Sequence, residues 1–247
     1  MEIGIPDGIC APADAVAASV REAGADCIRG APSEIRGAEP DLVIASGDRG
    51  MIAAVDAGFD APILPIDTSP AMEPIDRSDV PAAIESLIDD EADVVSRARL
   101  QCLTAEGSNP TGLTDAKLMT QEPAAISEFK ICSGDRTVGC CRADGIVVAT
   151  ATGSGGYARA AGGPIIGPEM SSIVVVPVSP YRTDPDHWSL PGDDLSIAVK
   201  RDDGDVLLYV DDDLIDLIAP GEPVNFETDP AAWATIRVPV SRSPFRR

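Results

Sequence analysis

The sequence contains few lysines, almost no histidine and few aromatic residues. Of its 247 residues, three are lysine, one is histidine (His187), and Phe, Trp and Tyr together make up 4%. With a single histidine and no Cys-x-x-Cys spacing among its six cysteines, the sequence does not predict a zinc site. A Ser-His-Asp or Cys-His mechanism would depend on His187, which lies in a polar stretch, so that kind of catalysis is not expected.

The sequence also lacks a long apolar run. No window of about 18 residues is uniformly apolar, so we expect no transmembrane helix and no membrane partner. Residues Met1 to Pro6 carry neither a basic start nor an apolar signal segment. We therefore expect a cytoplasmic protein with reduced cysteines.

Basic residues are outnumbered two to one. Asp and Glu number 41 against 19 Lys and Arg, which gives a formal net charge of -22. The acidic residues are spread along the whole chain, so nucleic acid is not an expected partner, because its phosphates would be repelled. A dispersed acidic surface that is poor in lysine is typical of proteins adapted to molar salt, where self-repulsion is screened. This pattern favours a haloarchaeal cytosol; the alternative is an acidic protein of ordinary habitat.

The first part of the chain, residues 1–95, alternates between apolar runs and amphipathic segments. This order predicts a doubly wound α/β domain. The expected strands cover residues 2–5, 26–29, 41–46 and 62–67, and the expected helices cover 12–23, 50–57 and 80–88.

The remainder, residues 96–247, predicts a β-rich, sandwich-like domain. Short alternating apolar runs are separated by turn residues, and one helix is expected at 154–162. The expected strands cover residues 127–133, 137–141, 146–149, 172–178, 195–199, 206–210 and 235–240. The extreme C-terminus is a candidate to pack back on the first domain.

The most informative stretch runs from Asp144 to Pro164. A buried strand at 146–149 leads into a turn of hydroxyl and glycine residues. The glycines remove every Cβ that would keep a ligand away from the backbone amides, which suits a nucleotide or its phosphates. The alternative is a flexible hairpin beside a helix.

A second motif, Ser46-Gly-Asp-Arg-Gly50, follows the buried strand at 41–46 and precedes a helix. It places Asp48 at the carboxyl end of a parallel strand, where open α/β sheets bind their ligands. The alternative is that Asp48 only caps the N-terminus of the helix.

Taken together, the two motifs resemble those of the NAD kinase family. That family has Gly-Gly-Asp-Gly-Thr after a strand of its α/β domain, Leu-Asn-Glu or Leu-Asn-Asp further on, and Asp-Gly-x-x-x-x-Thr-Pro-Thr-Gly-Ser-Thr-Ala-Tyr leading to Gly-Gly-Pro. The residues that match the last motif in register are Asp144, Gly145, Thr150, Thr152, Gly153, Ser154, Tyr157, Gly162, Gly163 and Pro164. Ala45-Ser-Gly-Asp48 and Leu113-Thr-Asp115 occupy the places of the other two. The order is kept over roughly residues 2–240.

The chain departs from the family pattern at several positions, which makes it a divergent member. Ser46, Arg49 and Gly50 replace Gly, Gly and Thr, and Thr114 replaces Asn. Further along, Ala151 replaces Pro, Gly155-Gly156 replaces Thr-Ala, Ala160 replaces Ser, and Val210-Asp-Asp-Asp213 lies where the family usually has Asp-Gly. The Arg49 side chain could add positive charge beside a phosphate.

The resemblance implies an ATP-dependent kinase that phosphorylates the 2′-hydroxyl of the adenosine ribose of NAD with the help of a divalent metal, Mg²⁺. Asp48 would be the catalytic base, Asp115 would accept hydrogen bonds from ribose hydroxyls, and Thr114 would contact the base. Arg142 and Asp144 would help to hold NAD across a subunit boundary, since the family forms dimers and tetramers. The residues implied in nucleotide binding are Gly47, Asp48, Arg49, Thr114, Asp115, Arg142, Asp144, Thr152, Gly153, Ser154, Gly155, Gly156, Tyr157 and Ala160. No metal ligand of the protein is implied.

Other interpretations remain open at this point. The altered Asp48 motif also fits a degenerate relative that binds a nucleotide in a regulatory or scaffolding role, and a kinase of a lipid or a sugar is a third possibility. Individually, Asp115 could only initiate a turn, Arg142 and Asp144 could form an exposed ion pair, and Tyr157 could pack between helix and sheet.

Overall fold

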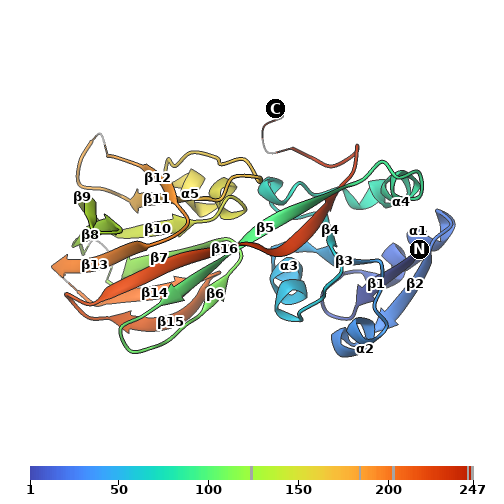
Figure 1. Ribbon diagram of the computed structural model, residues 1–247, viewed down its shortest axis with the longest axis horizontal. Coiled ribbons are helices and arrows are strands. Elements are labelled where there is room, and N and C mark those ends of the chain that lie inside the picture. The colour runs from blue at the N-terminus through green and yellow to red at the C-terminus, as the bar shows by residue number, and fades with distance from the viewer. Residues whose placement is uncertain (123–124, 184, 202–203, 244, 246–247) are drawn as a thin grey trace. The chain divides into compact units, whose positions relative to one another are not determined.

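The computed structural model describes residues 1–122, 125–183, 185–201, 204–243 and 245 (Figure 1). The chain divides into two compact units. Unit 1 comprises Met1–Arg97 and Trp233–Arg247, and unit 2 comprises Ala98–Ala232. Two long strands, β5 (Asp93–Leu103) and β16 (Pro223–Arg237), contribute residues to both units.

Unit 1 is built on a parallel sheet. The strands β2, β1, β3 and β4 are neighbours in that order, and Thr235 of β16 pairs in parallel with Ile63 of β4. Its elements are β1 (Glu2–Pro6), α1 (Ala13–Glu22), β2 (Asp26–Gly30), α2 (Pro32–Gly37), β3 (Leu42–Ser46), α3 (Gly47–Asp56), β4 (Ile63–Ile66), the short 3₁₀ helices η1 (Pro70–Met72) and η2 (Arg77–Asp79), and α4 (Val80–Ile88).

Helices cover both faces of this sheet. Ile3 and Ile5 of β1 belong to one hydrophobic cluster with Val16 of α1. Gly4, between them, faces the other way, and a Cβ on it would lie 2.6 Å from Ile35 of α2. Because successive residues of a strand point to opposite faces, β1 is covered on both sides. The expected doubly wound α/β domain is confirmed.

Unit 2 is a sandwich of two sheets. One contains β16, β13, β8 and β9 in that order, with β5 beside β16 and β6 beside β5. The other is antiparallel in the order β12-β11-β10-β7-β14-β15. The additional elements are β6 (Thr111–Gly112), β7 (Asp115–Thr120), β8 (Ser127–Ser133), β9 (Arg136–Ala143), β10 (Gly145–Ala149), η3 (Gly153–Gly155), α5 (Tyr157–Ala160), β11 (Ser172–Val178), β12 (Trp188–Pro191), β13 (Leu195–Arg201), β14 (Val206–Val210) and β15 (Asp213–Ile218).

The core of unit 2 lies between these sheets. Phe129 of β8 and Phe226 of β16 pack in the same cluster as Leu118 and Val148 of the second sheet. The alternate residues of β10 lie on the other face, where Val147 packs in a cluster that includes Ala158 of α5. β10 is therefore buried on both faces, which explains its continuous apolar sequence. The expected β-rich, sandwich-like domain is confirmed.

Two expected elements differ from the structure. The helix expected at 154–162 is reduced to η3 and the four residues of α5, since three glycines precede Tyr157 and disfavour a regular helix. The strand expected at 235–240 is the end of a longer one, because β16 begins at Pro223 and stops at Arg237. The sequence also did not predict β5, α2 or the strands β7, β12 and β15.

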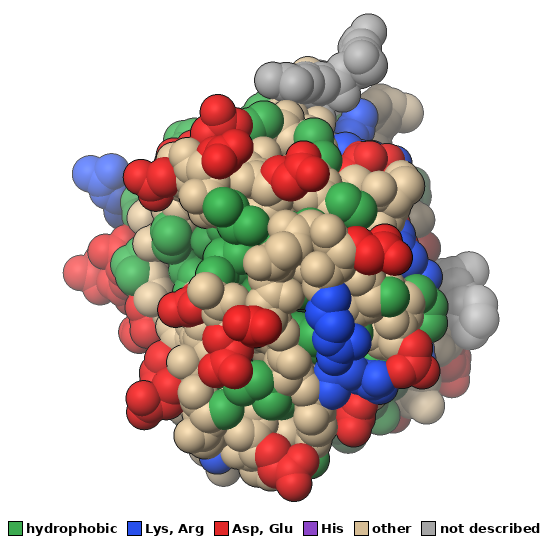
Figure 2. Space-filling view, turned by 90° about the vertical axis from the view of Figure 1, so that its right-hand side faces the viewer, with side chains coloured by type: hydrophobic (Ala, Val, Ile, Leu, Met, Phe, Trp, Pro, Cys, Tyr) green, Lys and Arg blue, Asp and Glu red, His purple; other side chains and the backbone are tan. Residues whose placement is uncertain are grey.

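Within the described ranges, no helix is long and apolar enough to cross a membrane. On the face shown in Figure 2, acidic side chains are widely scattered, and the largest group of basic side chains lies right of centre, with others at the left edge and near the top.

Candidate functional site

Asp48 lies in the first turn of α3, because the helix begins at Gly47, three residues earlier than expected. Gly47 has a φ of +69°, a conformation that glycine adopts without strain. The N-cap residue is Ser46, so the interpretation of Asp48 as the helix cap is wrong. The Asp48 Oδ1 atom accepts a hydrogen bond of 2.7 Å from the backbone N–H of Ser69. This contact orients an exposed carboxylate at the carboxyl end of the sheet.

The altered residues on either side of Asp48 fit the loop that follows β1. The Ser46 hydroxyl accepts a hydrogen bond from the Ala11 N–H at 2.7 Å and lies 3.2 Å from the Ala11 carbonyl oxygen, to which it donates. The Ser46 N–H donates to the Ile9 carbonyl at 3.2 Å. A Cβ on Gly50 would lie only 2.3 Å from that same Ile9 oxygen. Serine at 46 and glycine at 50 therefore secure the loop against the turn that carries Asp48.

In unit 2, the Thr114–Asp115 segment is held by the carboxylate of Asp211. Its Oδ1 accepts hydrogen bonds from the Thr114 N–H (2.8 Å), the Thr114 hydroxyl (2.6 Å) and the Asp115 N–H (3.3 Å). Its Oδ2 accepts from the Leu113 N–H at 2.5 Å. Because the Thr114 hydroxyl donates to Asp211, it can act toward a ligand only as an acceptor.

The glycine-rich turn after β10 lies directly on this segment. The Thr150 N–H donates to the Thr114 carbonyl at 2.9 Å, and the Thr150 hydroxyl donates to the Leu113 carbonyl at 2.7 Å. A Cβ on Gly153 would lie 1.9 Å from the Thr114 oxygen, so only glycine fits at this position. Two motifs that are more than 30 residues apart in the chain thus meet at the start of β7.

A charged cluster completes this part of unit 2. Asp115 Oδ1 lies 3.2 Å from the ammonium of Lys117, which also forms an ion pair with Asp212 and lies 5.5 Å from the centre of the Tyr157 ring. Burial raises the pKa of Asp115, and the charge of Lys117 opposes that rise. Burial lowers the pKa of Lys117, but Asp212 and Asp115 together raise it above its usual value.

The remaining predicted residues of the turn divide into buried and accessible ones. Thr152, Gly153 and Ser154 are buried. The Ser154 hydroxyl donates to the Ala151 carbonyl at 2.8 Å and accepts from the Ile166 N–H at 3.0 Å, so it stabilises the turn. The residues that face outward are Gly156, Tyr157 and Ala160, with Gly155 half-buried.

Arg142 and Asp144 lie at the opposite end of β10 from this turn. Asp144 precedes β10 and Thr150 follows it, a separation of about 20 Å at the usual rise along a strand. The Arg142 guanidinium lies 5.6 Å from the centre of the Tyr181 ring. The structure therefore does not bring these two residues to Thr114 and Asp115 within one chain.

Structure settles two of the open interpretations. Asp115 does not initiate a turn, because it is the first residue of β7 and pairs with Ala149 of β10. Tyr157 is not packed between helix and sheet, because 43% of it is exposed and its ring faces Lys117.

Lys117 and Asp211 were missed as site residues. A signal for Lys117 was present, since it is one of three lysines in the sequence and lies two residues after Asp115, on the same face of a strand. For Asp211 the signal was that Val210–Asp213 lies where the family usually has Asp-Gly, but its contacts with backbone groups almost 100 residues earlier in the chain are not visible in the sequence.

Architecturally, the chain combines a doubly wound α/β unit with a β-sandwich whose strand ends carry a glycine turn and buried carboxylate. Residues 113–238 match the family described as the ATP-NAD kinase C-terminal domain. Since this match covers just over half of the chain, the protein belongs to that family.

Individual relatives agree with this assignment. A NAD kinase of Methanosarcina barkeri is 38% identical over 102 residues, which cover 41% of this chain and 37% of that protein. A NAD kinase of Pyrococcus furiosus is 28% identical over 202 residues, 80% of this chain and 73% of that protein. The chain thus aligns with little more than a third of the length of the Methanosarcina relative.

Solved structures of similar proteins share the fold. A NAD kinase from Archaeoglobus fulgidus in complex with ATP superposes with a TM-score of 0.74 at 16% identity, over 96% of this chain and 93% of that one. Yeast NADH kinase complexed with NADH gives a TM-score of 0.77 at 17% identity, over 99% and 85% of the two chains.

Proposed function

We propose that this protein is a NAD kinase, which transfers a phosphoryl group from ATP to the 2′-hydroxyl of the adenosine ribose of NAD. The observation that carries the proposal is the meeting of the Thr114–Asp115 segment with the Gly153 turn, which no residue larger than glycine would allow. The family match over residues 113–238 covers both motifs. The similar proteins named above are kinases, and nothing in the geometry favours a non-catalytic relative.

In this proposal, Asp48 is the base that accepts the proton of the 2′-hydroxyl. The hydrogen bond from the Ser69 N–H holds Oδ1, which leaves Oδ2 to receive the proton. A carboxylate is a modest base, so its positioning beside the hydroxyl supplies much of the effect. Arg49 is exposed in the same helical turn and would place positive charge near a phosphate.

The residues of unit 2 would bind the dinucleotide. Asp115 accepts hydrogen bonds from ribose hydroxyls, and the Thr114 hydroxyl offers an acceptor to the base. Gly155 and Gly156 allow a ligand to approach the backbone, and the half-exposed ring of Tyr157 provides a flat apolar surface.

A divalent cation such as Mg²⁺ would enter with ATP. Among the described residues, no group of three or more His, Cys, Asp and Glu side chains is arranged to hold a metal ion. Mg²⁺ is usually bound through substrate phosphates and one or two carboxylates. The cation would neutralise charge on the phosphates, and no residue of the chain is assigned to it alone.

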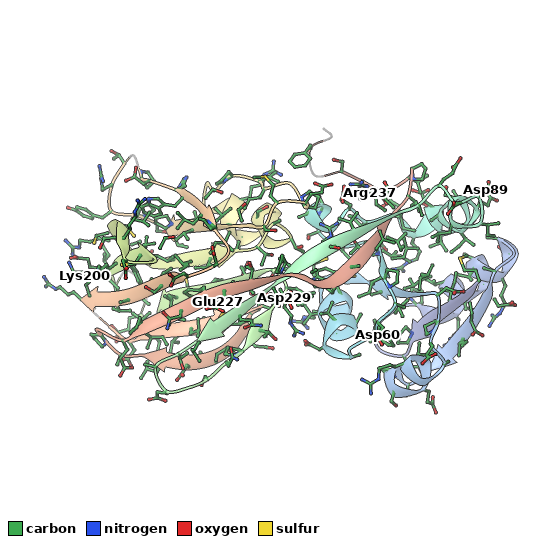
Figure 3. The ribbon with its side chains drawn as sticks, viewed as in Figure 1. Asp60, Asp89, Lys200, Glu227, Asp229 and Arg237 are labelled. Carbon is green, nitrogen blue, oxygen red and sulfur yellow. The ribbon has the colours of Figure 1, made fainter. Side chains whose placement is uncertain are left out.

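The assay that tests the proposal measures NADP formation from NAD, ATP and Mg²⁺ at high KCl. Wild type should form NADP, and Asp48→Asn should lose at least about 100-fold in kcat, which is the lower range for loss of a general base. Asp60→Asn, an exposed carboxylate labelled in Figure 3, is the matched control and should keep full turnover. Full turnover by folded Asp48→Asn would overturn the assigned mechanism, and no NADP from folded wild type would overturn the function.

We also propose that the protein works as a homodimer or homotetramer in the cytosol of a salt-adapted cell. Arg142 and Asp144 lie at the other end of β10 from Asp115, and a second subunit would allow them to contact an NAD molecule bound at Asp115. Light scattering at high KCl should show an oligomer, and Arg142→Ala should weaken NAD binding. A monomer that binds NAD with full affinity would contradict this arrangement.

A further inference from the structure

Lys117 is the charged centre of the cluster at the start of β7. Its side chain is only 12% exposed, and that of its partner Asp115 is 7% exposed. The Asp115 Oδ1 atom is buried and makes no hydrogen bond of good geometry within the described part of the chain. The ammonium 3.2 Å away is therefore the group that compensates the charge of this oxygen.

The three donors of the Lys117 ammonium match three neighbours. These are the carboxylates of Asp115 and Asp212 and the face of the Tyr157 ring. Lys117 is thus directed to protein groups, and it would act on a ligand through Asp115 rather than by direct contact.

The turn that presents Asp212 is strained. Asp211 and Asp212 have φ values of +47° and +75°, in the left-handed region that favours glycine. A non-glycine residue persists in such a conformation only when surrounding contacts hold it there. The side chain of Asp212 is 89% exposed, and the contact that holds it in this conformation is the ion pair with Lys117.

We propose that Lys117 is a positioning residue of the nucleotide site, where its ammonium keeps the buried Asp115 ionised and oriented as an acceptor for ribose hydroxyls. This inference rests on the proposed function for the identity of the ligand. An ionised carboxylate accepts hydrogen bonds on both oxygens, whereas a protonated one donates from one of them and binds a diol less well. Lys117 would therefore set the pH range over which the site binds NAD.

The sign of the pH effect follows from the groups that face Asp115. Lys117 lies on the same strand as Asp115, and Asp211 and Asp212 come from the β14–β15 turn, whereas Tyr157 of α5 faces Lys117. Two of these groups are carboxylates that disfavour ionisation, as does burial, and Lys117 is the one cation among them. Loss of Lys117 therefore raises the pKa of Asp115 further, and the ionised form then appears only at higher pH.

The experiment has two readouts, each made on full-length wild type and on Lys117→Met. Carbon-13 NMR of the Asp115 carboxyl reports its titration without ligand, and calorimetry measures the Kd for NAD between about pH 6 and 8.5, the range around neutrality. In Lys117→Met the Asp115 titration should move up by at least about one pH unit, and the Kd at the low end should weaken at least about tenfold relative to the high end. Wild type should show a flat Kd across the range.

Two further variants separate this role from a structural one. Lys117→Arg keeps a cation and should restore the flat profile. Lys200→Met removes an exposed lysine that pairs with Glu128 outside this cluster, so NAD affinity should stay within about twofold of wild type, as expected for a site that shares no partner with Lys117.

The outcomes are distinct. Asp115 titrating at the same pH in wild type and Lys117→Met would overturn the inference. A shifted titration with an unchanged Kd would show that Lys117 does not act on the ligand, which also overturns it. Wild type that binds no NAD would refute the proposed function and the proposed effect of Lys117 on NAD binding. The Asp115 titration would still test whether Lys117 keeps Asp115 ionised.

Discussion

Gly50 lies so close to the backbone of Ile9 that a Cβ at position 50 would be 2.3 Å from the Ile9 carbonyl oxygen. The Ser46 hydroxyl binds the same loop, because it accepts a hydrogen bond from the Ala11 N–H at 2.7 Å. Two positions that depart from the motif of the family are thus explained by one loop. Asp48, between them, is held from the other side by the Ser69 N–H at 2.7 Å.

The first prediction concerns Gly50→Ala. The added methyl group must displace the loop after β1, so the free energy of unfolding should fall by about 1–3 kcal/mol, and turnover should fall because Asp48 moves with the turn. Gly37→Ala is the control, since its Cβ would meet no atom within 4 Å; it should stay within about 0.5 kcal/mol of wild type. Thermal denaturation and the NADP assay measure both effects. Wild-type stability and activity in Gly50→Ala would contradict the close contact.

A second prediction concerns Asp211→Ala. The substitution leaves the N–H groups of Leu113, Thr114 and Asp115 without their carboxylate acceptor. We expect the free energy of unfolding to fall by about 1–3 kcal/mol and the Kd for NAD to rise. Asp213→Ala, an exposed position at the start of β15, serves as the control. Equal effects of the two substitutions would show that the Asp211 contacts contribute neither to stability nor to NAD binding.

The third prediction concerns the buried pair of Arg97 and Glu73. Arg97 is 1% exposed, and its guanidinium lies 3.1 Å from Glu73 Oε2 and donates to Thr235 Oγ1 at 3.0 Å. Arg237, labelled in Figure 3, lies 3.7 Å from the other Glu73 oxygen. Arg97→Met should lower the free energy of unfolding by roughly 3–5 kcal/mol, because the substitution leaves Glu73 buried without its closest cation.

Two variants check the Arg97 prediction. The double variant Arg97→Met, Glu73→Gln should recover part of the loss, since it removes the uncompensated charge. Arg242→Met, which removes an exposed partner of Asp76, should cost no more than about 1 kcal/mol. Denaturant unfolding gives all three values, and a double variant no more stable than Arg97→Met alone would count against charge as the cause.

The fourth prediction follows from the net charge of -22. Repulsion between the carboxylates acts over about 10 Å at 0.1 M salt and over about 3 Å at 1 M. The thermal midpoint should therefore rise steadily as KCl increases from about 0.1 to about 3 M. A thermal midpoint that is constant over this range would contradict the adaptation of this protein to high salt.

Much of the fold could be predicted because apolar patterns mark the buried strands. The runs at 172–178 and 206–210 became β11 and β14 with the expected bounds, since residues buried in a core must be apolar in a strict order. β5 was missed because Arg97 occupies an inward position, where a guanidinium is tolerated only through its particular partners. Those partners are distant in the chain, and no local pattern reveals them.

The candidate site could be predicted in part for a similar reason. Glycines at a strand end and a carboxylate after a buried strand are local signals, and they predicted that Asp48 and the Gly153 turn belong to the site. Ser154 was predicted to bind the nucleotide, but its hydroxyl bonds to backbone groups of the protein. Lys117 and Asp211 belong to the site although they were not predicted. Both additions depend on contacts between separate segments, which motif order does not specify.

The course of β16 has a consequence for how the chain can be divided. Unit 1 begins at the N-terminus and is completed only by Trp233 and the residues after it, with Ile236 and Val238 in its core. In topological terms, unit 2 is an insertion within unit 1. A fragment cut at residue 95 would therefore lack part of its own interior, and a circular permutant that joins the two segments of unit 1 directly is the better route to an autonomous version of it.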